Sequence, residues 1–317
     1  MPPTTSPTGP RHSAWITGSG HSGTVGDATA LFPYWSFTKT VIAICALRLA
    51  EVGTLTLNTR PDDMPWTLSQ LLQHSAGLRD YGQWNDYHRA VANGGTPWPR
   101  DDVRDRALSA GPLFAPGDGW SYSNVGYILA IEMIEAASGK PLSQLIADLI
   151  TVPLGLRSVR LASTCADFAN LHWPDAARYD PGWVYHGCLT GTAPDAARLL
   201  DAVMTGALLA PPSLAAMNDV VPLGGAIPGR PWKTCGYGLG LMSGTVAHAG
   251  RAIGHSGAGP FCVNAVYHFP DRADPITVAS FASGHQEGEA EHTCTALALK
   301  LARDHNTDQQ AAPRPRP

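Results

Sequence analysis

The most continuous apolar segment of the chain predicts a buried helix from Phe37 to about Val52. Its apolar positions fall on nearly every side of a helical wheel, which is typical of a helix covered all round rather than one with a solvent-exposed face. Gly53 follows directly and suits the end of a helix. Before this helix, short extended pieces are expected at Ser13–Thr17 and Leu31–Tyr34, separated by glycine-rich turns.

The centre of the chain, from about Arg60 to Arg230, has helical periodicity interrupted by proline and glycine. Helices are expected there at Leu68–Gln73, Asp101–Ala110, Val125–Ser138, Leu142–Ile150, Ala193–Met204 and Ser213–Asn218. From about Pro231 the apolar pattern changes to that of strands. These are expected at Tyr237–Met242, Phe261–His268 and Ile276–Ala282, before a last helix from about Gly288 to Asp304.

Strands at both ends of the chain, with helices between them, predict an α+β protein. The simplest assembly joins residues 12–59 and 231–306 into one domain, an antiparallel sheet flanked by helices. Residues 60–230 are then an inserted, mostly helical domain, and a cleft between the two is a natural ligand site. Residues 1–11 and 307–317 are expected to be flexible tails.

The composition excludes some classes of partner but does not identify the substrate. The chain has 317 residues, 44% apolar and 15% charged, which is enough apolar material for a sizeable core. Its formal net charge of −4 and its scattered arginines give no indication of a nucleic-acid partner. No stretch reaches about 18 uninterrupted apolar residues, so no membrane association is expected. The sequence does not determine an oligomeric state.

The N-terminal residues show no signal peptide pattern, so we expect a cytoplasmic protein, although a secreted protein trimmed of its signal peptide would look the same. The six cysteines include no Cys-x-x-Cys pair, and we expect buried free thiols rather than disulfides or zinc ligands. Since His-Glu-x-x-His is also absent from the sequence, neither a metal site nor another cofactor is expected.

The first candidate for chemistry is Ser36-Phe37-Thr38-Lys39, at the start of the apolar helix. Residues three apart on a helix share one face, so Lys39 can take the proton of Ser36 or hold a base that does. The helix start also favours developing negative charge. The alternative is a helix-capping serine followed by a solvated lysine. The all-round apolar character of the helix argues against a solvated Lys39.

A second candidate, Tyr122-Ser123-Asn124, lies on a turn that leads into a helix. Tyr122 is a potential general base for Ser36, and the amide of Asn124 offers donors and an acceptor to a substrate. Alternatively, Asn124 is only the N-cap of that helix. Trp120, two residues earlier, is the tryptophan best placed to line a cleft.

A third candidate, Gly254-His255-Ser256-Gly257-Ala258-Gly259, precedes the apolar strand at Phe261–His268. Glycines at the edge of a sheet let a substrate lie against the strand backbone, and the N–H of Ala258 can join that of Ser36 as an oxyanion hole. The alternative is a glycine-rich hairpin turn.

The order Ser-x-x-Lys, Tyr-Ser-Asn and His-Ser-Gly resembles the serine β-lactamase and penicillin-binding protein superfamily, in particular its class C, DD-carboxypeptidase-like and esterase branch. Leu71–Leu78, Pro153–Leu156 and Tyr237–Gly240 also resemble segments of that branch. The resemblance spans about Leu31 to Ser283 and implies the β-lactamase/transpeptidase-like fold.

By this resemblance Ser36 is the nucleophile, with Lys39 and Tyr122 sharing the acid–base work. Substrate-binding roles fall to Trp120, Asn124, His255, Ser256 and Gly257, and the oxyanion hole to the N–H groups of Ser36 and Ala258. His255 departs from the lysine found in many β-lactamases, and a neutral imidazole binds a substrate carboxylate more weakly and with pH dependence.

The resulting prediction is a serine hydrolase that acts on an ester, amide or D-peptide bond of a small-molecule or peptide substrate. Two alternatives remain open at this point. An acyltransferase would use the same acyl-enzyme. A non-catalytic receptor would bind peptides or β-lactams without turning them over, although it would have no need for Ser36, Lys39 and Tyr122 together.

Overall fold

The computed structural model describes residues 11–60 and 64–311, with side chains as far as Arg303. Its main feature in those residues is an eight-stranded sheet of order β2-β1-β11-β10-β9-β8-β7-β6, in which every neighbouring pair is antiparallel. The strands are β1 (Arg11–Thr17), β2 (Ser22–Val25), β6 (Val221–Gly224), β7 (Trp232–Tyr237), β8 (Met242–Val246), β9 (Gly250–Ala258), β10 (Cys262–Phe269) and β11 (Ile276–Ser283).

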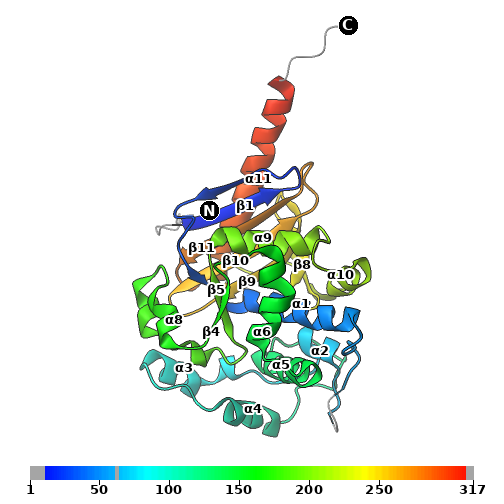
Figure 1. Ribbon diagram of the computed structural model, residues 1–317, viewed down its shortest axis with the longest axis vertical. Helices are drawn as coiled ribbons and strands as arrows, with labels where there is room; N and C mark the ends of the chain where they lie inside the picture. The colour runs from blue at the N-terminus through cyan, green and yellow to red at the C-terminus, as the bar shows by residue number, and fades with distance from the viewer. Residues whose placement is uncertain (1–10, 61–63, 312–317) are drawn as a thin grey trace.

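One helix covers each face of this sheet. α9 (Ala193–Met204) packs on β1, β10 and β11, whereas α11 (Glu287–Ala311) packs on β9, β10 and β11 and extends beyond the sheet in Figure 1. Every residue of β10 is buried as a result. A strand covered on both faces gains from apolar side chains, and six of the eight residues of β10 are apolar. The other two, Asn264 and His268, are hydrogen-bonded to Pro33 O and to the hydroxyl of Thr277.

The central segment of the chain surrounds the buried helix α1 (Thr38–Glu51), which packs on α5 (Asn124–Ser138) and α6 (Leu142–Ile146). Eleven of the fourteen residues of α1 are buried, as its sequence predicts. Other helices here are α2 (Leu68–Leu72), α3 (Asn85–Ala92), α4 (Arg100–Ser109), α7 (Val152–Leu154), α8 (Cys165–Ala169) and α10 (Pro211–Met217), with a π-helical turn η3 (Ala147–Thr151) and 3-10 turns η1 (Trp35–Phe37), η2 (Tyr81–Gln83), η4 (Pro174–Arg178) and η5 (Pro181–Trp183).

A second, three-stranded sheet of order β3-β5-β4 links the two parts of the chain. It consists of β3 (Phe32–Pro33), β4 (Arg160–Ala162) and β5 (Cys188–Gly191). Because β3 leads directly into η1, and β5 follows the central helices, this sheet ties the start of α1 to the centre of the chain. Figure 1 shows β4 and β5 between the large sheet and the helices.

The α+β class and the antiparallel sheet flanked by helices are confirmed. The strand expected at Tyr237–Met242 is wrong, because Gly238–Leu241 turns the chain between β7 and β8. Gly240 has φ of +72°, a conformation that favours glycine. Sequence periodicity also missed α3 and α8, as well as β9, whose glycines obscure its pattern.

The division into two domains stays a prediction. α9 and β6 fall inside the segment assigned to the helical domain, yet they pack on or extend the large sheet. The predicted boundaries of the two flexible tails are wrong in the residues that the structure describes. Arg11 belongs to β1, and α11 continues to Ala311, while residues 1–10 and 312–317 lie outside the described part of the chain.

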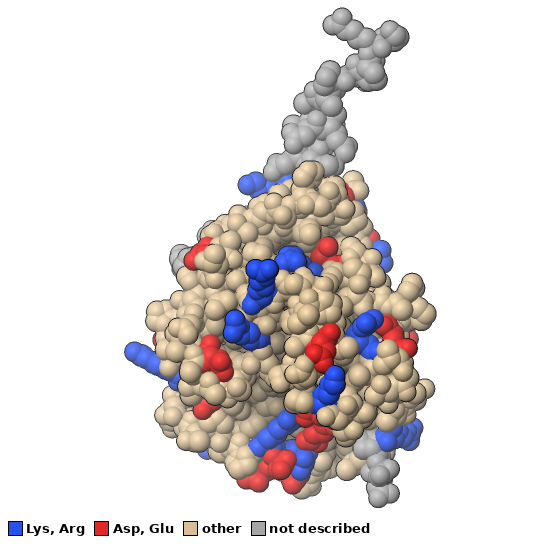
Figure 2. All heavy atoms as spheres, in the orientation of Figure 1, with Lys and Arg blue, Asp and Glu red and all other residues tan. Residues whose placement is uncertain are grey.

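The cysteine prediction is confirmed for five residues and wrong for one. All six cysteines lie in the described residues and are free thiols, but Cys165 is exposed because α8 places it at the surface. Among the described helices, none is long and apolar enough to cross a membrane. On the face shown in Figure 2, acidic and basic side chains are interspersed.

Candidate active site

Ser36 lies in η1, directly before α1, and is held there by an unusual backbone conformation at Trp35. The φ angle of Trp35 is +41°, which is uncommon for a residue with a large side chain and costs conformational energy. Surrounding contacts hold the indole in place. It donates to Cys262 Sγ at 3.2 Å and packs edge-on against Tyr179 and Phe261.

The end of strand β9 and the residue after it pass so close to Ser36 and Trp35 that only glycine fits at two positions. A Cβ atom on Gly257 would lie 2.8 Å from the backbone nitrogen of Ser36, and one on Gly259 would lie 2.2 Å from the ring of Trp35. The predicted glycines are therefore needed for close approach and are not merely part of a hairpin turn. Ala258 lies between them and, like Ser36, faces both cavities described below.

Lys39 lies one helical turn after Ser36 and is completely buried. Its Nζ atom is 3.2 Å from Ser36 Oγ, 2.7 Å from Asn124 Oδ1 and 3.0 Å from His186 Nε2. Burial lowers the pKa of Lys39 to about 7, although the carboxylates of Asp80 and Glu287 oppose that change. A neutral amine is therefore accessible near neutral pH.

Tyr122 also contacts both Ser36 and Lys39, whose Nζ atom lies 4.9 Å from the centre of the tyrosine ring. Its hydroxyl donates to Ser36 Oγ at 2.8 Å. Removal from water raises the pKa of Tyr122 well above its usual value, and the hydrogen bond to Ser36 only partly offsets this. The phenol is therefore protonated, so the geometry provides a base in Lys39 and a proton donor in Tyr122.

Asn124 is the first residue of α5, and the N-cap is Ser123, whose hydroxyl accepts from Gly126 N at 3.2 Å. The alternative in which Asn124 is only the N-cap of this helix is therefore wrong. Its amide oxygen accepts from Lys39, and its amide nitrogen donates to Asp80 at 3.1 Å. Asp80 thereby fixes the orientation in which Asn124 accepts from the lysine.

His255 is buried, and its Nε2 atom is 2.8 Å from the hydroxyl of Tyr237. Burial lowers the pKa of His255 to about 3, so the ring stays neutral at ordinary pH. The pH-dependent contact expected from its replacement of lysine is therefore absent above about pH 4. Trp120 packs near Tyr237 and His74 on the same side of Ser36 as His255.

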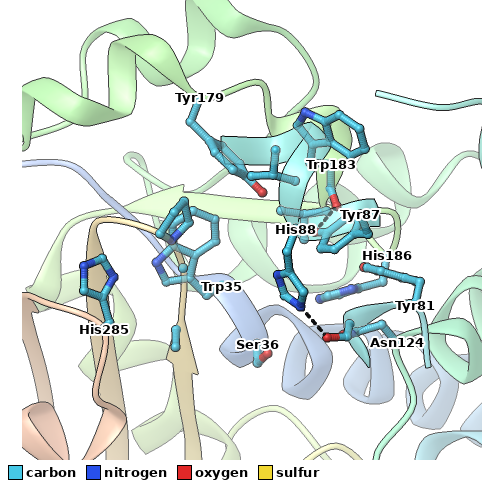
Figure 3. A pocket seen from close by; sticks show the side chains of 16 residues that line it. Trp35, Ser36, Tyr81, Tyr87, His88, Asn124, Tyr179, Trp183, His186 and His285 are labelled. Atoms are coloured by element: carbon cyan, nitrogen blue, oxygen red, sulfur yellow. Dashed lines mark hydrogen bonds between the residues drawn. The ribbon is translucent and has the colours of Figure 1, made fainter. Parts of the chain in front are cut away.

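Two cavities meet at Ser36, Asn124 and Ala258. The first, which we call the aromatic cavity, has a volume of about 480 Å³. Figure 3 shows Ser36 and Asn124 on one side of it and Tyr179 and Trp183 on the other. Its remaining lining includes Trp35, Tyr81, Tyr87, His88, Val91 and His186.

The second, which we call the charged cavity, has a volume of about 560 Å³. Tyr122 lines this cavity together with Trp120, Tyr237, His255, Ser256, Arg230 and Glu287. The hydroxyl of Ser256 donates to Glu287 Oε1 at 3.1 Å and accepts from Arg230 Nη2 at 2.8 Å. Ser256 is thus part of an ionic cluster at the cavity wall.

The structure brings all the predicted site residues together around Ser36. Sequence reasoning missed Asp80, His186 and His74, which surround Lys39, Asn124 and Tyr122, and also the ionic cluster with Arg230 and Glu287. A signal existed for Asp80, since it follows the Leu71–Leu78 segment by two residues. None existed for His186, one of twelve histidines. Within the described residues, no group of three or more His, Cys, Asp or Glu side chains is arranged to hold a metal.

Comparison with known proteins identifies the family of this chain. The Beta-lactamase family model matches residues 14–303. Esterase EstB of Burkholderia gladioli is 28% identical, over 81% of this chain and 78% of its own length. Penicillin-binding protein 4* of Bacillus subtilis (strain 168) is 32% identical, over 42% of this chain. The match covers only 31% of that protein, so this chain corresponds to less than a third of its length.

Solved structures share the fold at low sequence identity. D-amino acid amidase from Ochrobactrum anthropi SV3 superposes with a TM-score of 0.76 at 20% identity, covering 92% of this chain and 94% of that one. A D-stereospecific amidohydrolase from a Streptomyces species gives 0.73 at 22% identity, covering 89% and 93%. At this level of identity the superpositions establish the fold.

Proposed function

The chain belongs to the Beta-lactamase family of serine hydrolases, and we propose that it hydrolyses an ester, amide or D-peptide bond through an acyl-enzyme on Ser36. One observation carries the proposal. Ser36 Oγ lies between Lys39 Nζ at 3.2 Å and Tyr122 Oη at 2.8 Å, where two cavities meet. A nucleophile, a base and an acid are thus in contact before any substrate arrives.

Acylation begins with the neutral amine of Lys39. Asn124 Oδ1 accepts one of its N–H bonds, and in the tautomer protonated at Nδ1 His186 Nε2 accepts the other, which leaves the lone pair for the proton of Ser36. As that proton moves to Lys39, Ser36 Oγ bonds to the substrate carbonyl carbon. The resulting oxyanion is stabilised by the N–H groups of Ser36 and Ala258.

Tyr122 determines which cavity holds the leaving group. Collapse of the tetrahedral intermediate breaks the bond to the leaving oxygen or nitrogen, which must gain a proton. Tyr122 is the protonated hydroxyl beside Ser36, and it lines the charged cavity but not the aromatic one. The leaving group therefore departs through the charged cavity, and the ammonium of Lys39, whose Nζ lies 4.9 Å from the centre of the Tyr122 ring, returns a proton to the tyrosine phenolate.

The acyl group then remains in the aromatic cavity, where rings such as those of Tyr179 and Trp183 cover an apolar chain or ring. Water enters the vacated charged cavity and gives a proton to Lys39 as it bonds to the acyl carbon. Ser36 Oγ leaves with a proton, and the acid product is released. Hydrolysis restores Ser36, Lys39 and Tyr122 to their starting states.

The test is intact-protein mass spectrometry after mixing with 4-nitrophenyl butyrate and, separately, with a β-lactam, on wild type and on Ser36→Ala. We expect a transient mass increase equal to the acyl group in wild type and none in Ser36→Ala, with release of 4-nitrophenol lost in parallel. Turnover by Ser36→Ala near the wild-type rate would refute the nucleophile. A Ser36 adduct that never decays would instead support the receptor alternative.

A further inference from the structure

The charged cavity contains one basic side chain, Arg230, and its charge is already neutralised from behind. Arg230 Nε donates to Glu291 Oε2 at 2.7 Å, and Nη2 donates to Glu291 Oε1. Glu291 is completely buried, and it also accepts from Trp232 Nε1 at 3.0 Å and from the hydroxyl of Tyr267. This bidentate pair uses the edge of the guanidinium that would otherwise bind a substrate carboxylate.

Glu287 adds a second carboxylate to the same arginine. Arg230 Nη1 donates to Glu287 Oε2 at 2.8 Å, and the remaining Nη2 donor is directed to Ser256. Four of the five guanidinium N–H groups are thus engaged within the protein. One positive and two negative charges leave the cluster with a net charge of −1.

The uncompensated charge lies at the cavity surface. The side chain of Glu287 is 29% exposed, compared with 0% for Glu291. Glu287 is the first residue of α11. His255 also lines this cavity, but its ring is neutral. Among the described residues of the lining, no cation without a carboxylate partner is therefore left for an anionic substrate group.

From this arrangement we infer that the enzyme selects substrates whose leaving alcohol or amine carries a positive charge, and rejects those whose leaving group carries a carboxylate. The inference rests on the proposed function, because it requires the leaving group to occupy the charged cavity. A cation there is attracted by the negative charge of Glu287, whereas a carboxylate is repelled by it and finds at most one N–H of Arg230 that is not already engaged within the protein. Glu287 is then a specificity-determining residue.

The experiment uses three butyrate esters of phenols that differ only at the para position. The substituents are trimethylammoniomethyl, carbamoylmethyl and carboxymethyl, each separated from the ring by one methylene. Because the cationic phenol remains the most acidic, each kcat/KM is divided by the rate constant of that ester's hydrolysis by hydroxide. We expect kcat/KM to fall in that order, with a cation-to-carboxylate ratio of about 100 for wild type at low ionic strength.

Glu287→Gln removes the charge with little change in shape and should lower that ratio about tenfold. Glu287→Asp keeps the charge and should preserve most of the ratio. Glu289→Gln, on the same helix but outside the cavity lining, is the matched control and should leave the ratio unchanged. Each variant is accepted only if its melting temperature shows a folded protein.

A wild-type preference for the carboxymethyl ester, or a ratio equal in wild type and Glu287→Gln, would overturn the inference while leaving the acyl-enzyme intact. Absence of Ser36-dependent turnover with all three esters would overturn the proposed function and the inference with it. The two failures are therefore distinguishable, since only the second removes hydrolysis of the neutral ester.

Discussion

The aromatic and charged cavities share Ser36, Asn124 and Ala258 but differ in almost everything else. The aromatic cavity has rings on several sides, and its lining includes Ser36 and His186, which contacts Lys39. The charged cavity contains Tyr122, the proton donor, and an ion cluster tied to α11. The difference indicates that one side of the site retains the acyl group by shape, and the other releases a leaving group by charge and proton transfer.

The largest losses of kcat/KM are expected from removing the base, Lys39, or the proton donor, Tyr122. Lys39→Met removes the base and should lower kcat/KM by about 10³-fold or more for every substrate. Tyr122→Phe should cost about 10³-fold for an alkyl amide but only about tenfold for a 4-nitrophenyl ester, whose leaving group needs no proton. Steady-state kinetics on both substrates measure this.

Equal losses for the two substrates in Tyr122→Phe would contradict the assignment of the proton donor to the charged cavity. Thermal unfolding of both variants is the control. Lys39→Met should be at least as stable as wild type, because burying an amine that can ionise is unfavourable.

A substitution at Gly257, beside Ser36 where the two cavities meet, should lower kcat equally for all substrates. Gly257→Ala places a Cβ atom 2.8 Å from Ser36 N, so strand β9 must shift away from the oxyanion hole. We expect kcat to fall about 100-fold for all substrates, with leaving-group selectivity retained. Gly225→Ala, which places its Cβ in open space with only Lys233 O at 3.9 Å, is the matched control. A near-normal kcat in Gly257→Ala would contradict the assignment of the oxyanion hole to the N–H groups of Ser36 and Ala258.

A smaller effect should follow from the contact between His186 and Lys39. Since the base is the neutral amine and the pKa of Lys39 is about 7, kcat/KM should rise from pH 6 to 8 and then level off. His186→Phe removes an acceptor that stabilises the charged amine, so this rise should move to lower pH, with kcat reduced about tenfold by the misoriented amine.

His88→Phe is the matched control, because His88 lines the same cavity but its imidazole bonds to the carbonyl of Gly82. Its pH profile should match that of wild type. A profile of His186→Phe that does not move would show that the contact with Lys39 has no influence on the base.

The smallest effect should be confined to the aromatic cavity. Val91→Phe narrows it and should lower kcat/KM about fivefold for a decanoyl ester, but leave an acetyl ester unaffected. The preference among leaving groups should not change. A loss that depends on the leaving group and not on acyl length would reverse the assignment of the two cavities.

The sequence by itself determined the parts of this site that depend on local geometry. Ser36 and Lys39 share a face because they lie three residues apart at a helix start, and the apolar surroundings of that helix predict a buried amine. The turn signals before α5 placed Tyr122 and Asn124 close together at the start of that helix. The order of these segments was enough to indicate the family.

Only the tertiary structure decided how those groups are tuned. His186 contacts Lys39 across 147 residues, and Arg230 meets Glu287 across 57, at separations for which no local pattern exists. The sequence shows Arg230 as one cation among 22 basic residues, available to any anionic substrate. Folding pairs this arginine with the carboxylates of Glu287 and Glu291. The strength of such interactions depends on distance and burial and not on sequence order, so only the folded chain reveals a cavity that favours a cation.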